Sequence, residues 1–328
     1  MRNKIALSER SYFRLNGMAS SKTTTLVTEI LSLLDGDWIS WSNVLELLAY
    51  DHGLKQVVRL AVDKETSGII ADFCHRYRWP YRLSDFWLEP VFRTNLNDTF
   101  SRLVYGNAPS DCIRVLFIGR EVATRRAEKL EAIPDRKEAS ELALLYGYPK
   151  CCTTAYAEVQ SGLPWLDAYL SNSSIQGQVW NWRSNKIAYL FPPHHTLLPE
   201  YFPCSVACES TIRLAQSYEA VLRNYGLTEL LDIVRDHLMR PMLFFSGSLY
   251  RFGGLELRDG WYHVVGSTER HIIDDQAVQL NQKTNTIEAI RVGCGELWVR
   301  NTLGEWHEQL IPARTQLLRF GYEKAAEN

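Results

Sequence analysis

Four cysteines at two predicted helix starts constrain the fold of this 328-residue chain more than any other feature. Cys151 and Cys152 follow a Gly-Tyr-Pro-Lys segment, and Cys204 and Cys208 follow a Tyr-Phe-Pro segment. A glycine or proline ends the preceding element in each case, and the cysteines come where a new helix is expected to begin. Unpaired N–H groups and the positive end of the helix dipole favour thiolate over thiol there. If the two helix starts face each other, three or four thiolates converge and need a cation between them.

The spacing of these cysteines leaves the identity of the cation open. A helix beginning at Cys204 would place Cys204 and Cys208 on one face, and their spacing matches that of zinc sites. Adjacent residues project in different directions, so Cys151 and Cys152 rarely ligate one tetrahedral ion together. A cluster with several metal atoms relaxes that constraint, and we therefore expect an iron–sulfur cluster, with structural zinc as the alternative. Cys152, Cys204 and Cys208 are then ligands, and Cys151 is the fourth ligand or a reactive thiol. Simple packing of these cysteines, or a redox dithiol pair, is the remaining interpretation.

Composition excludes several other classes of protein. The 36 basic and 38 acidic side chains leave a net charge of −2, which argues against a general nucleic-acid binder. No run approaches the ~18 apolar residues of a membrane span, and the N-terminus lacks the apolar stretch of a secretory signal. We therefore expect a cytoplasmic protein, in which cysteines bind metal more often than they form disulfides. The isolated Cys74, Cys112 and Cys294 are expected to pack as small hydrophobic side chains.

The hydrophobic pattern predicts an α+β fold, with a mostly helical main domain followed by a small antiparallel β region. Apolar residues recur at helical spacing from Leu26 to Leu34, up to Gly36, and a second helix is expected from Ser42. Short strand-like runs begin after Pro241, and Asp259-Gly260 between two of them is a strong hairpin signal.

One short α/β unit is expected within the helical part. The apolar run from Cys112 to Ile118 predicts a strand that ends at Gly119, and a helix is expected from Arg120 to Ala132. We therefore divide the chain into a helical N-terminal region (1–110), a cysteine-site α/β region (111–240) and the antiparallel β region (241–328).

Three further residues are candidates for catalysis beside the cysteines. His195 lies in a Pro-bounded loop shortly before Cys204, where imidazole can act as an acid or base. Arg120 follows a predicted strand, at the end where α/β proteins place ligand-contacting groups, and its guanidinium suits a carboxylate or phosphate. Glu209 is the nearest carboxylate for proton transfer, although capping of a helix is its usual role. Trp165, Tyr169, Trp180 and Trp182 are ordinarily core residues, but they are also placed to exclude water from a cluster.

The two cysteine segments resemble those of a poorly characterised prokaryotic family with a Gly-Tyr-Pro-x-Cys-Cys motif and a downstream Pro-Cys-x-x-x-Cys motif. The matching residues are Gly147, Tyr148, Pro149, Cys151, Cys152, Pro203, Cys204 and Cys208. The likeness extends from Phe117 to about Leu222, roughly a third of the chain. It implies a shared cysteine-rich site and no particular reaction.

The cysteine motifs and the composition are compatible with two functional hypotheses. In the first, the chain is an iron–sulfur-dependent enzyme acting on a small molecule, with an electron-donor protein as a candidate partner and His195 and Arg120 facing the substrate. In the second, zinc or cysteine packing stabilises a non-enzymatic binding module.

Overall fold

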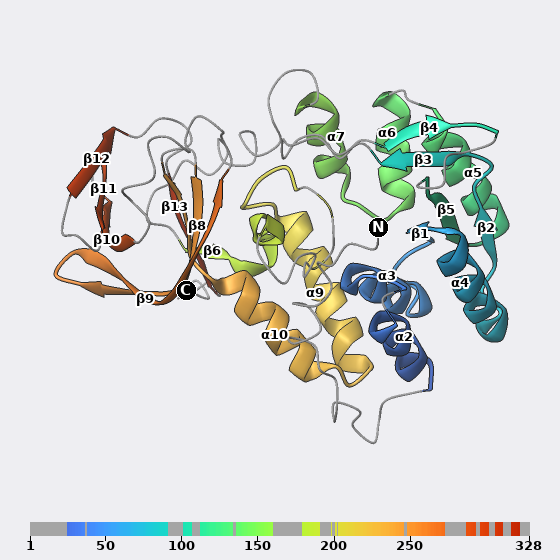
Figure 1. Ribbon diagram of the computed structural model, residues 1–328, viewed down its shortest axis with the longest axis horizontal. Helices are drawn as coiled ribbons and strands as arrows, with labels where there is room; N and C mark the ends of the chain where they lie inside the picture. The colour runs from blue at the N-terminus through green and yellow to red at the C-terminus, as the bar shows by residue number, and fades with distance from the viewer. Residues whose placement is uncertain are drawn as a thin grey trace.

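The computed structural model combines helices with antiparallel sheets (Figure 1). It describes residues 25–36, 38–90, 101–106, 112–133, 136–159, 179–190, 198, 201, 203–245, 248–272, 287–292, 296–301, 306–310 and 316–321. Helices account for 49% of these residues, so the predicted mixed α+β class is confirmed, while the prediction of a mostly helical main domain is not.

Helices cover both faces of a small sheet, and several of them lie between it and a larger sheet (Figure 1). They are α2 (Thr25–Asp35), α3 (Trp41–Asp51), α4 (Lys64–Tyr77), α5 (Glu121–Glu131), α6 (Arg136–Leu145), α7 (Lys150–Val159), α9 (Glu209–Asn224) and α10 (Thr228–Met239), with two 3₁₀ turns, η1 (Trp182–Ser184) and η2 (Ile187–Leu190). The first two follow their sequence signals closely. Helix α2 ends just before Gly36, and α3 begins after Ser40, whose side chain forms a capping box with Asn43.

The small sheet has the strand order β1 (Val57–Val62), β5 (Arg114–Gly119) and β2 (Tyr81–Leu83). Side chains of β5 alternate between two cores, as expected of a strand covered on both faces. Val115 and Phe117 pack with residues of α5 and with Tyr146, whereas Leu116 and Ile118 join the core formed by α2, α3, α4, α9 and α10.

The predicted strand and helix around Gly119 are both present, but their sheet is antiparallel. Helix α5 begins one residue after Arg120, and β5 pairs antiparallel with both β1 and β2. The carboxyl end of β5 therefore lies beside the amino end of β1, where Val57 pairs with Gly119. Ligands gather at the carboxyl ends of parallel strands, so the basis for expecting a ligand at Arg120 does not apply to this antiparallel sheet.

The large sheet contains eight strands and forms one end of the molecule in Figure 1. In spatial order they are β12 (Trp306–Leu310), β11 (Glu296–Asn301), β10 (Ile287–Val292), β9 (Trp261–Ile272), β8 (Ser248–Arg258), β7 (Met242–Phe245), β13 (Gln316–Gly321) and β6 (Val179–Asn181). The Asp259-Gly260 turn joins β8 to β9 as predicted, with φ of 51° and 78° at its two residues. A separate two-stranded ribbon pairs β3 (Trp87–Pro90) with β4 (Ser101–Val104).

Strand pairing crosses residue 240. The last strand, β13, pairs in parallel with β6, which precedes α9 and α10 in the chain. Met242 and Leu249 of β7 and β8 also belong to the same hydrophobic core as α2 and α3. The β strands therefore pack directly onto the helical part. No helix within the described ranges is both long and apolar enough to cross a membrane.

Candidate metal centre

The four cysteines of the two motifs meet in space, as the sequence predicted. The Sγ atoms of Cys151, Cys152, Cys204 and Cys208 all lie within 4.8 Å of one another. Cys208 Sγ is 3.7 Å from the sulfur of Cys151 and 3.5 Å from that of Cys152, and the sulfurs of the adjacent pair are 3.8 Å apart. The adjacent sulfurs therefore face the same point, despite the expectation that neighbouring residues project apart. The four sulfurs could hold a metal ion.

A glycine turn directs α7 toward this cluster. Gly147 has a φ of 79°, a left-handed conformation that ends α6. Its N–H donates to the Leu144 carbonyl and the N–H of Tyr148 donates to the Ala143 carbonyl, the two bonds of a Schellman motif. Helix α7 then starts with the Cys152 N–H donating to the carbonyl of Pro149. Cys151 and Cys152 thus lie in the first turn of α7.

The second pair of cysteines is arranged differently from the prediction. Helix α9 begins at Glu209 and not at Cys204, because the Cys208 N–H closes a turn onto the Ser205 carbonyl before the helix starts. Cys208 is the N-cap residue of α9, and Cys204 lies in the preceding loop. Two helix N-termini nevertheless point their positive ends at the sulfurs, which favours thiolates in both segments.

The four cysteines differ in burial, and hydrogen bonds between them shift the pKa values of Cys152 and Cys208 in opposite directions. Cys152 and Cys208 are buried, Cys204 is half-buried and Cys151 is exposed. Hydrogen bonds with the Cys152 and Cys204 thiols hold the pKa of Cys208 well below its usual range. Hydrogen bonds with Cys204 and Cys208 raise the pKa of Cys152 far above it. The two opposite shifts have one cause, the hydrogen bonds between the sulfurs, and a bound cation would replace the protons in those hydrogen bonds.

Two stacked tyrosines pack against the sulfurs. The rings of Tyr148 and Tyr201 lie 4.9 Å apart at an interplanar angle of 21°, and Tyr201 forms one small core with Cys152 and Cys208. The Tyr201 hydroxyl donates to Thr211 Oγ1 at 2.6 Å, and Thr211 Oγ1 lies 3.5 Å from Cys152 Sγ. The sequence interpretation missed these residues, although both tyrosines stand one or two positions before the proline of each motif.

Two buried lysines flank the tyrosine pair. Lys55 Nζ lies 5.3 Å from the centre of the Tyr148 ring, and Lys186 Nζ lies 5.4 Å from that of Tyr201. Lys55 also pairs with Glu46, and Lys186 donates to the Leu198 carbonyl at 2.6 Å. The charge of Lys55 is balanced by the Glu46 carboxylate, whereas the Lys186 ammonium places a positive charge beside the Tyr201 ring, where it would offset part of the negative charge of the thiolates.

The other predicted site residues are not brought into this cluster by any contact that the structure describes. Glu209 is exposed at the start of α9, with Oε2 lying 3.7 Å from Arg213 Nη1, one helical turn along. Arg120 is the exposed N-cap residue of α5, where its side chain makes no capping hydrogen bond. His195 lies outside the described residues, and so do Trp165 and Tyr169.

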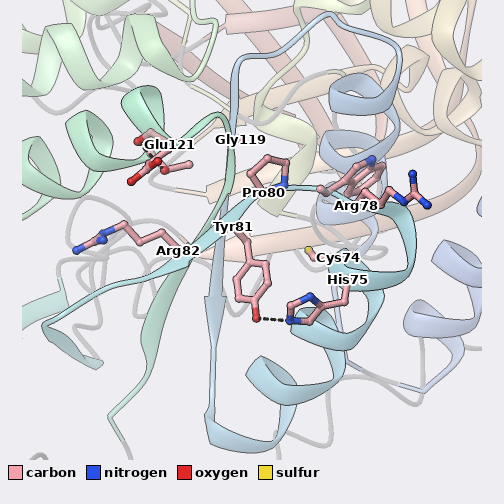
Figure 2. A pocket seen from close by; sticks show the side chains of 10 residues that line it. Cys74, His75, Arg78, Pro80, Tyr81, Arg82, Gly119 and Glu121 are labelled. Carbon is pink, nitrogen blue, oxygen red and sulfur yellow. Dashed lines mark hydrogen bonds between the residues drawn. The ribbon is translucent and has the colours of Figure 1, made fainter.

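A separate hollow of about 520 Å³ is lined by the two sequence neighbours of Arg120, Gly119 and Glu121 (Figure 2). Residues that end α4 and begin β2 also line it, and Tyr81 and His75 are joined there by a hydrogen bond of 3.0 Å. The only cysteine among its described lining residues is Cys74, so this hollow does not open onto the four-cysteine cluster.

The remaining aromatic and cysteine predictions can be checked by burial. Cys74 and Cys112 are buried, as expected for cysteines that pack as hydrophobic side chains, and Cys294 is outside the described residues. Trp180 and Trp182 belong to the main hydrophobic core.

Comparison with known proteins gives no relative from which a function can be transferred. No protein-family model, curated protein or solved structure matches this chain.

Proposed function

We propose that the chain is a metalloprotein in which four cysteines bind a single tetrahedral ion, and that this ion is zinc. The distances between sulfur atoms support the proposal. A tetrahedral zinc ion with Zn–S bonds of about 2.3 Å holds its sulfurs about 3.8 Å apart, since a tetrahedron's edge is 1.63 times its centre-to-corner length. The three Sγ–Sγ distances among Cys151, Cys152 and Cys208 run from 3.5 to 3.8 Å, and all four sulfurs lie within 4.8 Å of one another.

The same distances weigh against a cluster of several iron atoms. In a four-iron cluster each cysteine binds a different iron, so the cysteine sulfurs stand farther apart than around one ion. The positions of the sulfurs therefore favour one zinc ion over the iron–sulfur cluster expected from the cysteine spacing, because the sulfurs of Cys151 and Cys152 face the same point although the two residues are adjacent in sequence.

The proposed role of the ion is to fasten α7 to the start of α9. Four protein ligands close the coordination sphere, as in structural zinc sites, whereas catalytic zinc keeps a position for water or substrate. Among the described residues, the buried members of the small hydrophobic core at this point are Cys152, Tyr201 and Cys208, with Tyr148, Cys204 and Leu214 packed against them. An ion bonded to both segments would supply cohesion that such a small core cannot provide.

An iron–sulfur enzyme acting on a small molecule remains the second candidate. The exposure of Cys151 favours it, because an exposed ligand gives a substrate access to one edge of the centre. In that case His195, Arg120 and Glu209 are the candidates for substrate binding and proton transfer, and an electron-donor protein is the expected partner.

Metal analysis of anaerobically purified protein separates the two candidates. We expect one zinc per chain, no acid-labile sulfide and no visible absorbance. Iron with stoichiometric sulfide and a brown colour would replace zinc with the cluster. A chain that carries no metal and takes up neither zinc nor iron after reduction would overturn the metalloprotein proposal. A Cys208→Ala variant should lose the ion, while a Cys112→Ala variant, altered at a buried cysteine outside the cluster, should keep it.

A further inference from the structure

One hydroxyl group contacts a ligand sulfur and is itself held by a second hydroxyl group. Thr211 lies in the first turn of α9, is fully buried, and places Oγ1 3.5 Å from Cys152 Sγ. The Tyr201 hydroxyl donates to the same oxygen at 2.6 Å. Tyr201 in turn is fixed by its stacking on Tyr148. Tyr148, Tyr201 and Thr211 are therefore connected by successive contacts that end at the sulfur of Cys152.

The direction of the hydrogen bonds follows from counting protons. Tyr201 uses its single hydroxyl proton on Thr211, so the proton of Thr211 is free for another acceptor. When Cys152 binds a metal ion it is a thiolate without a proton, and only Thr211 can then donate across the Thr211–Cys152 contact. The hydrogen bond from Tyr201 polarises the Thr211 hydroxyl and makes it a stronger donor.

We propose that Thr211, held by Tyr201, is a positioning residue of the metal centre: its hydroxyl donates to the Cys152 thiolate, fixes that sulfur and reduces its electron donation to the ion. This inference rests on the proposed function, because it concerns a residue that acts through a ligand of the proposed ion. Groups that hydrogen-bond metal ligands set the orientation of those ligands, and their loss weakens metal binding by about 10- to 100-fold.

The test compares Thr211→Val, which removes the hydroxyl but keeps the shape, with Thr211→Ser, which restores it. Zinc affinity is measured by competition with a chelator, and the sulfur-to-metal charge-transfer band is recorded after loading with Co²⁺. We expect Thr211→Val to lose about 10- to 100-fold in zinc affinity and to shift the Co²⁺ band to lower energy, because a thiolate without its hydrogen bond gives up an electron more readily. Thr211→Ser should restore both values.

Thr153 provides a matched control. It is a buried threonine directly after Cys152, but its hydroxyl donates to the Lys150 carbonyl at 2.9 Å. Thr153→Val should therefore leave the Co²⁺ band unchanged. Tyr201→Phe should shift the band in the same direction as Thr211→Val, by a smaller amount, and it decides the question if Thr211→Val does not fold.

The outcomes separate this inference from the proposed function. Wild-type protein that binds neither Zn²⁺ nor Co²⁺ overturns both. Wild-type protein that binds one ion, with Thr211→Val and Tyr201→Phe variants that match it in affinity and in band energy, overturns only the positioning role of Thr211.

Discussion

Removal of the proposed ion should lower the free energy of unfolding by an amount that depends on how tightly it binds. Cys152 and Cys208 are 56 positions apart in the chain, so the complete ligand set exists only in the folded protein. A ligand that binds the folded state alone stabilises it by about 2.7 kcal/mol at 100 times its dissociation constant, and by about 4.1 kcal/mol at 1,000 times. Taking about 2 °C per kcal/mol for a chain of this size, chelation should lower the melting temperature by about 5–8 °C.

The assay is thermal unfolding in the presence and absence of a chelator, with metal content measured on the same samples. The Cys208→Ala variant is the control for direct effects of the chelator. It should melt at a lower temperature than the wild type and should show no further decrease on chelation. Complete removal of the ion with an unchanged melting temperature would refute the fastening role, and so would an equal chelator effect in the variant.

Three further predictions concern residues outside the ligand set. Gly147→Ala should cost about 1 kcal/mol in unfolding free energy, because the left-handed φ disfavours a residue with a Cβ. Crowding adds nothing to this cost, since the nearest atom to an added Cβ, Lys55 Cε, lies 3.9 Å away. Unchanged stability in a urea titration would argue against the glycine turn. Burial raises the pKa of Cys74 to about 12, so the thiol stays neutral in the folded protein. Its contribution to the free energy of unfolding is therefore lost only as the pH rises from about 9 toward 12. Alkylation of Cys74 in native protein at pH 8.5, detected by mass spectrometry, would contradict this prediction. Glu219→Ala should lower the free energy of unfolding by about 3–5 kcal/mol, because it leaves the largely buried Arg183 guanidinium without its carboxylate partner. A decrease below about 1 kcal/mol in the same titration would show that solvent screens this ion pair as it does a surface pair.

Local signals carried most of the successful sequence predictions. Gly147 and the Asp259-Gly260 turn have left-handed backbone conformations that few other residues adopt, and Gly36 directly follows the end of α2, so the elements they end or connect could be located from the sequence. The convergence of the cysteines was inferred from two helix starts with the same chemistry. The structure confirms the convergence itself, since the four sulfurs lie within 4.8 Å of one another.

The parts that could not be predicted depend on contacts between distant residues. Nothing in the short β6 segment indicates that β13, more than 130 residues later, will pair with it. The antiparallel direction of the β1–β5–β2 sheet is likewise set by chain connections and not by the apolar run of β5. The start of α9 was misplaced because Pro203 suggested a helix at Cys204, whereas a turn closed by Cys208 intervenes.

The stacked pair of Tyr148 and Tyr201 was not predicted for a similar reason. Tyr148 and Tyr201 lie in separate motifs, and their stacking follows from the meeting of those motifs and not from either segment alone. Each tyrosine stands three positions before a cysteine, whereas Trp180 and Trp182 are farther from the cysteines in sequence and pack in the main core. The aromatic residues within each motif were therefore the better guide to the rings that pack against the sulfurs.

X-ray absorption at the metal edge of the purified protein tests the central claim most directly. One zinc ion held by Cys151, Cys152, Cys204 and Cys208 predicts a single shell of four sulfur atoms at about 2.3 Å, with no metal–metal scattering. Nitrogen or oxygen ligands in place of sulfur, or an iron edge with a second metal nearby, would contradict the assignment of one ion to these four thiolates.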